Sequence, residues 1–153
     1  MASETASQTR HIPAHSGSFS TRLVADASAI VDLLAGAPNT PAIAAALAPF
    51  LEVDVPEHFH VEALSALRGM MMRGDLAADR AERALQLLPE LRVVRHPVEP
   101  LARVVWSMRD TLIAYDAAYL AVAQHIDAQL LTTDRGLTAA AQRDGRLLEV
   151  PAS

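Results

Sequence analysis

The chain alternates short apolar runs with longer segments of helical spacing, and this alternation constrains its fold more than any other feature. The apolar runs are 22–26, 51–55, 92–95 and 129–132. Strands that alternate with helices in this way form units in which the strands lie parallel and the helices cover the sheet. The sequence therefore predicts an α/β fold with a central parallel sheet.

Helices are expected at 28–34, 41–48, 57–73, 75–88, 98–108, 114–126 and 137–143, and an edge strand at 147–150. In 57–73, the side chains of Leu64, Leu67 and Met71 are expected to face the core, which leaves Glu62 beside small residues on the opposite face. We expect part of this apolar stripe to cover the sheet and the rest to form a groove for an amphipathic segment of a partner. The stripe consists of Leu64, Leu67, Met71, Ala77, Ala81, Ala84, Leu85 and Leu88.

Composition limits the chemistry that the chain can perform. Its 153 residues are enough for one domain, and they include neither cysteine nor lysine. Disulfides, thiolate metal sites, cysteine nucleophiles, phosphate-binding lysines and Schiff bases are therefore excluded. The net charge of −5 argues against a broad basic surface for nucleic acid, although a narrow acidic pocket could still hold a cation.

The first twenty residues differ from the rest of the chain. They are rich in Ser, Thr, Ala and His with few large apolar side chains, so residues 1–20 are expected to form a disordered tail and 21–153 the folded domain. They lack the apolar stretch of a secretory signal, and no part of the sequence has the ~20 uncharged apolar residues of a membrane span. We therefore expect a cytoplasmic protein without a membrane anchor.

Two carboxylates follow predicted strands. Asp26 ends the run Leu23-Val24-Ala25, and Asp134 comes just after the run 129–132. Because ligands of parallel sheets bind at the carboxyl ends of the strands, both acids are expected at the edge where a site would lie. The simpler alternative is that each carboxylate caps the helix that follows it.

Asp116 is the most informative acid in the sequence. It is the only charged residue in the twelve residues 112–123, which are otherwise almost entirely apolar. An unpaired carboxylate in a buried helix would cost several kcal/mol, so Asp116 must be protonated, paired with an arginine or directed at a metal ion. Pairing with Arg109 is the plainest alternative.

If Asp26, Glu62, Asp116 and Asp134 converge, they need a cation. Two carboxylates about 4 Å apart repel by about 4 kcal/mol at an effective dielectric constant of about 20. Oxygen ligands without cysteine select a hard divalent ion, Mg²⁺ or Mn²⁺. Such an ion activates water and stabilises phosphoryl oxygens, which points to phosphodiester hydrolysis.

Four motifs in this sequence resemble those of the PIN domain, and specifically of the VapC-type toxin ribonucleases. They are Val24-Ala-Asp26-Ala-Ser28, the segment from Pro56 through Glu62 to Arg68, the segment from Trp106 through Asp116 to Ala123, and Leu130-Leu-Thr132-Thr-Asp134-Arg135. They occur in the order of the family and cover residues 22 to about 150.

The resemblance implies a three-layer α/β/α sandwich and an endoribonuclease that depends on Mg²⁺ or Mn²⁺. It assigns the metal-binding and catalytic acids to Asp26, Glu62, Asp116 and Asp134, with Ser28 and Thr132 as supporting hydroxyls. It also implies a homodimer that is neutralised by a small cognate antitoxin of the VapB type.

The leading hypothesis is therefore a toxin that cleaves RNA with water activated by the ion. Arg109 and Arg135 lie next to site motifs and are candidates for binding RNA phosphates, with a structural counter-ion as the alternative for each. Two other functions stay open at this point. One is a PIN-fold interaction module without catalytic activity, and the other is a DNA nuclease of related fold.

Overall fold

A computed structural model describes residues 21–150 of the chain. The expected tail, residues 1–20, lies outside the described residues, as do 151–153. The strands are β1 (Leu23–Ala25), β2 (Val53–Pro56), β3 (Val93–His96) and β4 (Gln129–Leu131). The helices are α1 (Ala27–Ala35), α2 (Thr40–Leu47), α3 (Phe59–Arg73), α4 (Ala78–Leu87), α5 (Ala102–Ser107), α6 (Ala114–His125) and α7 (Arg135–Arg143), with short 3-10 turns η1 (Leu88–Glu90) and η2 (Glu99–Leu101).

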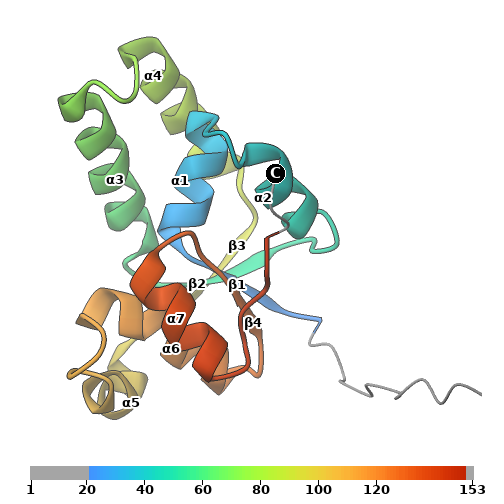
Figure 1. Ribbon diagram of the computed structural model, residues 1–153, viewed down its shortest axis with the longest axis vertical. Coiled ribbons are helices and arrows are strands. Elements are labelled where there is room, and N and C mark those ends of the chain that lie inside the picture. Colours follow the sequence, from blue (N-terminus) through green and yellow to red (C-terminus); the bar gives the residue numbers. More distant parts are fainter. Residues whose placement is uncertain (1–20, 151–153) are drawn as a thin grey trace, which may run out of the picture.

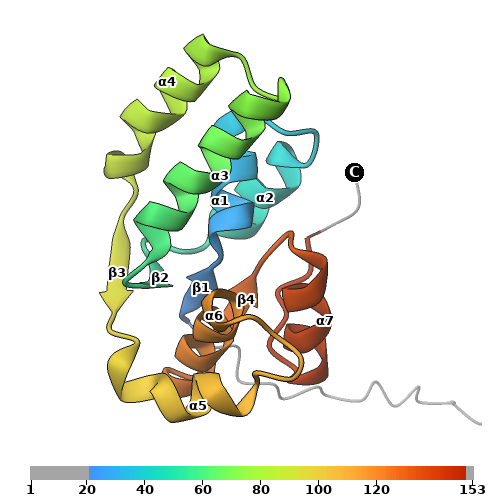
Figure 2. The same ribbon diagram turned by 90° about the vertical axis from the view of Figure 1, so that its left-hand side faces the viewer.

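The strands form one parallel sheet in the order β3-β2-β1-β4. Helices α1 to α4 lie on one side of it and α5 to α7 on the other, as Figures 1 and 2 show. Helix α1 packs on α2, α3 and α4, whereas α6 packs on β1, β2 and β4. The predicted three-layer α/β/α sandwich around a parallel sheet is confirmed.

The predicted edge strand at 147–150 is reduced to a single bridge. Leu147 pairs with Leu130, and Leu130 exchanges backbone hydrogen bonds with Arg146 and Leu148. Because β4 itself has only three residues, little of its outer edge is left for a longer ladder. The predicted helix at 98–108 is also divided, since it begins as the 3-10 turn η2 around Pro100 and continues as α5.

The buried face of α3 differs from the expected one. Phe59, Ala63 and Leu67 are buried, at a spacing of four residues, whereas Leu64 and Met71 are 46% and 41% exposed. The expectation that Leu64 and Met71 face the core is therefore wrong. Helix α3 packs against α1 and α4 and not flat on the sheet, so its contact face is narrow and leaves the flanking apolar residues in solvent.

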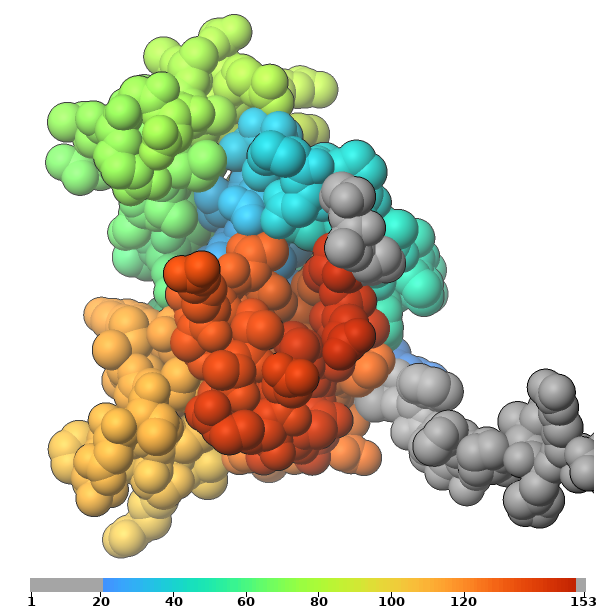
Figure 3. All heavy atoms as spheres, viewed as in Figure 1, coloured from blue at the N-terminus to red at the C-terminus, as the bar shows by residue number. Residues whose placement is uncertain are grey.

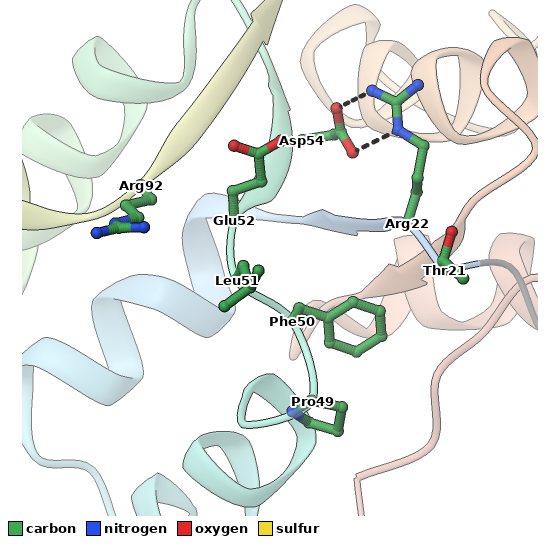
Figure 4. Close-up of a pocket in the computed structure, with 8 residues that line it drawn as sticks. All are labelled: Thr21, Arg22, Pro49, Phe50, Leu51, Glu52, Asp54 and Arg92. Carbon is green, nitrogen blue, oxygen red and sulfur yellow. Dashed lines mark hydrogen bonds and ion pairs between the residues drawn. The ribbon is translucent and has the colours of Figure 1, made fainter.

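A buried carboxylate in β2 joins three strands. Asp54 is 3% exposed and accepts hydrogen bonds from both Nε and a terminal nitrogen of Arg22, the pair drawn in Figure 4. His96 at the end of β3 lies with Nε2 2.7 Å from Asp54 Oδ1. Asp54 also lines a pocket of about 440 Å³ at the amino ends of the strands, with Glu52 and Arg92. The sequence analysis gave Asp54 no role, although it is as buried as Asp26.

Replacing Asp54 by alanine is expected to lower the free energy of unfolding by about 2–3 kcal/mol. Loss of one partner of a buried ion pair costs about 3–5 kcal/mol, and the estimate is reduced because the Arg22 side chain is 44% exposed. Urea denaturation with an unchanged m-value measures the effect. Glu52→Ala, an exposed acid two residues away, is the control and should change stability by less than about 0.5 kcal/mol. Equal stability of the two variants would show that the Asp54 cluster does not support the fold.

Candidate active site

Four acidic side chains occupy the carboxyl edge of the sheet, each at the start of a helix. Asp26 and Asp134 precede α1 and α7 directly, and Glu62 and Asp116 lie in the first turns of α3 and α6. Their charges act on one another. Asp134 raises the pKa of Asp26, while Asp26 raises the pKa of both Glu62 and Asp116. The surface of the molecule is hollowed between α3 and α7, with α1 visible at its floor (Figure 3).

Asp26 is the most enclosed of the four acids. Its carboxylate does not cap α1 and accepts hydrogen bonds from the hydroxyls of Ser28 and Thr132, the latter at 2.7 Å. Ser28 Oγ in turn accepts the backbone N–H of Thr133 at 3.1 Å, and Thr132 Oγ1 accepts that of Asp134 at 3.0 Å. Burial raises the pKa of Asp26, against the lowering effect of the two hydroxyls. The hydroxyls thus fix Asp26 and join β1 to the loop after β4.

Asp134 plays the capping role that the sequence left open. Its Oδ1 accepts the backbone N–H of Leu137 at 2.8 Å, in the first turn of α7. Asp134 is exposed, so its carboxylate can still turn its other oxygen toward a ligand. Arg135 beside it is also exposed, at the first position of α7.

Glu62 is half-buried and tied to the opposite layer of the fold. The hydroxyl of Tyr119 donates a hydrogen bond of 2.7 Å to Glu62 Oε2, and Nε2 of His58 lies 3.5 Å from the same oxygen. Burial raises the pKa of Glu62, with smaller contributions from Asp26 and Asp116. The hydrogen bond from Tyr119 therefore holds Glu62 of α3 against α6, the helix that also carries Asp116.

The sequence analysis assigned no role to Tyr119 or His58. Tyr119 is fully buried, and the ring of His58 contacts the edges of Tyr119 and Tyr115 at centroid distances of 5.5 and 5.3 Å. Two spacings could have indicated this cluster. His58 and Glu62 are four residues apart on a helix, and Asp116 and Tyr119 are three apart, so each pair lies on one face.

Asp116 is not paired with Arg109, the alternative that the sequence left open. The guanidinium of Arg109 lies 5.5 Å from the centre of the Trp106 ring and 3.6 Å from the carboxylate of Asp110. Among the ion pairs of residues 21–150, none includes Asp116. Burial, followed by the charges of Asp134 and Asp26, raises the pKa of Asp116 to about 6. Of the two arginines proposed for RNA, Arg109 is stacked on Trp106 and Arg135 lies beside the acids.

The carboxylate oxygens of the four acids are suitable ligands for a hard divalent ion. However, the described part of the chain contains no preformed metal site. No three His, Asp or Glu side chains of residues 21–150 stand close enough together to hold a metal. Three of the four acids have raised pKa values through burial and mutual repulsion, and a cation among them would relieve both. Asp26 is already fixed, so Glu62, Asp116 and Asp134 would have to turn toward it.

Comparisons with known proteins agree with this arrangement. The PIN domain family model matches residues 23–142. Ribonuclease VapC3 of Mycobacterium tuberculosis is 39% identical over 119 residues, which cover 78% of this chain and 87% of the relative. Ribonuclease VapC1 of the same species is 35% identical over 118 residues, or 76% of this chain and 89% of the relative. The crystal structure of PAE2754 from Pyrobaculum aerophilum aligns with a TM-score of 0.56 and 25% identity, covering 77% of this chain and 78% of that one.

A parallel α/β/α sandwich with acids at the carboxyl edge of its sheet, together with these matches, shows that the chain belongs to the PIN-domain family. Within that family it is of the VapC type, as the sequence motifs predicted. None of the helices in residues 21–150 combines the length and the hydrophobicity needed to cross a membrane.

The raised acid pKa values predict that the metal-free protein loses stability as the pH rises. Between about pH 4 and pH 6, native Asp116 keeps its proton while the same residue of the unfolded chain has lost it. The native state therefore binds more protons than the unfolded state, so the free energy of unfolding falls across this range and stays lower above it. Asp26 and Glu62 act in the same direction.

Asp116→Asn should therefore stabilise the protein in EDTA at pH 7.5 by about 1 kcal/mol, and by much less at pH 4. Each unit by which the pKa of native Asp116 exceeds that of the unfolded chain would contribute about 1.4 kcal/mol if the shift counted in full. The estimate is reduced because Asp116 is partly exposed to solvent. Urea denaturation at the two pH values provides the measurement, with Asp110→Asn, an exposed acid of the preceding loop, as control. A gain that is equal at both pH values would contradict the electrostatic origin.

Proposed function

We propose that the protein is a divalent-metal-dependent endoribonuclease of the cytoplasm, the toxin of a toxin–antitoxin pair, which hydrolyses phosphodiester bonds of RNA. The observation that carries this proposal is the group of four acids at one sheet edge, with Asp116 lacking an arginine partner among residues 21–150. Membership of the PIN-domain family and the similarity to two ribonucleases support RNA as the substrate.

Asp26 and Asp116, with Glu62, Asp134 or both, would hold Mg²⁺ or Mn²⁺. When bound, the ion supplies positive charge that activates water and stabilises the phosphoryl oxygens. Ser28 and Thr132 keep the Asp26 carboxylate in place through their hydrogen bonds. Glu62, which burial makes a better proton acceptor and which Tyr119 orients, is suited to take the proton of the attacking water.

Arg109 and Arg135 are proposed to bind RNA phosphates. Both side chains are exposed, and Arg135 is adjacent to Asp134 in sequence. With a net charge of −5 and few such arginines, the protein would contact few phosphates, so its affinity for RNA should depend only weakly on salt.

A catalytically silent interaction module and a DNA nuclease are the two competing functions. The presence of all four acids disfavours the first, because an inactive copy would be free to lose one. Parallel cleavage assays with RNA and DNA of one sequence separate the proposed function from the second.

Removal of the metal should abolish RNA cleavage, and Mg²⁺ or Mn²⁺ should restore it. Asp116→Asn should reduce cleavage at least about 100-fold, since even indirect contacts of a metal site are worth about 10–100-fold. Thr132→Val removes one of the two hydroxyls that donate hydrogen bonds to Asp26, and it should reduce cleavage by about 10–100-fold. The measurement is cleavage of a labelled RNA with EDTA and with each ion, and Asp110→Asn should cleave as the parent does. Cleavage by Asp116→Asn in EDTA would overturn the metal assignment.

The cognate antitoxin is proposed to bind the outer face of α3 and α4. The expected apolar stripe divides in the structure, because Leu67, Ala81, Ala84 and Leu88 are buried and Leu64, Met71 and Leu85 are 38–46% exposed. The exposed part, extended by Met72 at 72%, would accept an amphipathic segment of the partner. A basic side chain of that partner would then reach the acids and displace or crowd the metal.

Met71→Glu and Leu85→Glu should abolish antitoxin binding and leave RNA cleavage unchanged, because both side chains are exposed and remote from the acids in sequence. The gene directly upstream is first searched for a short reading frame of a DNA-binding protein, whose product is the probe; its affinity is measured by calorimetry after folding is verified by circular dichroism. Exposed Leu51→Glu on the other side of the domain is the control. Unchanged affinity in both folded variants would place the antitoxin elsewhere.

A homodimer is also part of the proposal, in line with the family resemblance. Trp106 on α5 is 69% exposed and Val104 beside it 39%, so they offer an apolar anchor for a second copy.

A further inference from the structure

A small pocket opens beside the acids and shares one of them. It has a volume of about 270 Å³ and is lined by His58, Val61, Glu62, Ser65 and Tyr115. We call it the Tyr115 pocket. Its residues come from the first two turns of α3, its N-cap His58 and the first turn of α6, so its walls include the helix segments that carry Glu62 and Asp116. Whatever occupies this pocket therefore lies next to the site of cleavage.

Tyr115 is an aromatic residue that the fold leaves largely in solvent. It is 60% exposed, and within residues 21–150 its hydroxyl makes no hydrogen bond, whereas Tyr119 on the same helix is buried and holds Glu62. One contact orients the ring, since His58 meets it edge to face at 5.3 Å with an interplanar angle of 66°. The ring is thus held in place while much of it remains open to solvent.

The charges around the pocket limit what it can bind. No arginine lines it, the carboxylate of Glu62 belongs to its lining, and Asp116 is the residue after Tyr115 in the sequence. A phosphate would be repelled there, whereas a neutral, planar ring would find an aromatic face, the exposed side chain of Val61 and the hydroxyl of Ser65.

We propose that the Tyr115 pocket binds one nucleobase of a single-stranded RNA, next to the phosphate that is cleaved. The base stacks on Tyr115, and Ser65 offers its edge a hydrogen bond. The pocket thereby favours unpaired RNA, since a paired base would first have to unstack and unpair at a cost of a few kcal/mol. This inference rests on the proposed function and adds the substrate feature that positions the scissile phosphate over the acids.

The first experiment finds which base matters. The parent protein cleaves a randomised RNA with Mn²⁺, and the product ends are sequenced. One preferred oligonucleotide is then compared with copies that carry a single abasic nucleotide at each position flanking the cut. The abasic copy that lacks the stacked base should be cleaved with a kcat/KM about 10–100-fold lower, the usual effect of losing one base–aromatic stack.

The second experiment links that base to Tyr115. Tyr115→Ala should lower kcat/KM for intact RNA by a similar factor and should no longer distinguish it from the abasic copy. Tyr115→Phe keeps the ring and should remain within about threefold of the parent. Ile113→Ala, equally exposed two residues earlier but outside the pocket lining, should behave as the parent.

Several outcomes would overturn the proposal. The proposal fails if Tyr115→Ala cleaves intact RNA as fast as the parent, and it also fails if the variant loses the same factor on intact and on abasic RNA. A parent dimer that Tyr115→Ala converts to monomers would show instead that a second copy fills the pocket. The affinities of intact and abasic RNA are also measured by fluorescence anisotropy with Ca²⁺. If the parent binds RNA but never cuts it, the proposed function fails. The proposal for the pocket then depends on whether the parent binds intact RNA more tightly than abasic RNA, and equal affinities would overturn it.

Discussion

The whole arrangement depends on how the fold buries the carboxylate of Asp26. Asp26 directly follows β1, one of the two inner strands of the sheet, and is 3% exposed. The hydroxyls of two residues donate hydrogen bonds to its carboxylate, and no cation among residues 21–150 pairs with it. The same hydroxyls receive backbone N–H groups from the loop after β4. One hydrogen-bond network therefore fixes both the first acid and the loop that carries the last one, and the rest of the site is built around a rigid centre.

Helix starts explain why four acids can gather at one edge. Each of them precedes or lies in the first turn of a helix, where unpaired N–H groups and the helix dipole favour negative charge. That effect offsets part of their mutual repulsion, but burial first, and the charges of neighbouring acids second, still raise the pKa values of Asp26, Glu62 and Asp116. The edge of the sheet thus holds a strained set of charges that a divalent cation would relax.

Sequence reasoning predicted that Asp26, Asp116 and Asp134 belong to one site because strand ends and apolar helices leave a clear pattern. Asp26 and Asp134 follow apolar runs, and Asp116 interrupts one, so the parallel topology alone brought them together. It missed Asp54, because an acid between two valines in a short strand looks like an ordinary alternating pattern, and its partners Arg22 and His96 are far away in sequence. It also placed Leu64 and Met71 in the core, because periodicity shows that a helix has an apolar face but not how wide its contact will be.

The strand order has a consequence for the synthesis of the protein. The central strand β1 is made first, yet its neighbour β4 lies more than a hundred residues later, with Leu23 paired to Gln129. Thr132, which holds Asp26, and Asp134 come from the same late segment. A growing chain that ends before this segment has neither the completed sheet nor the full set of acids. Residues 129–134 therefore have to be synthesised before the sheet and the candidate site can be complete, so the folded domain can form only late in translation.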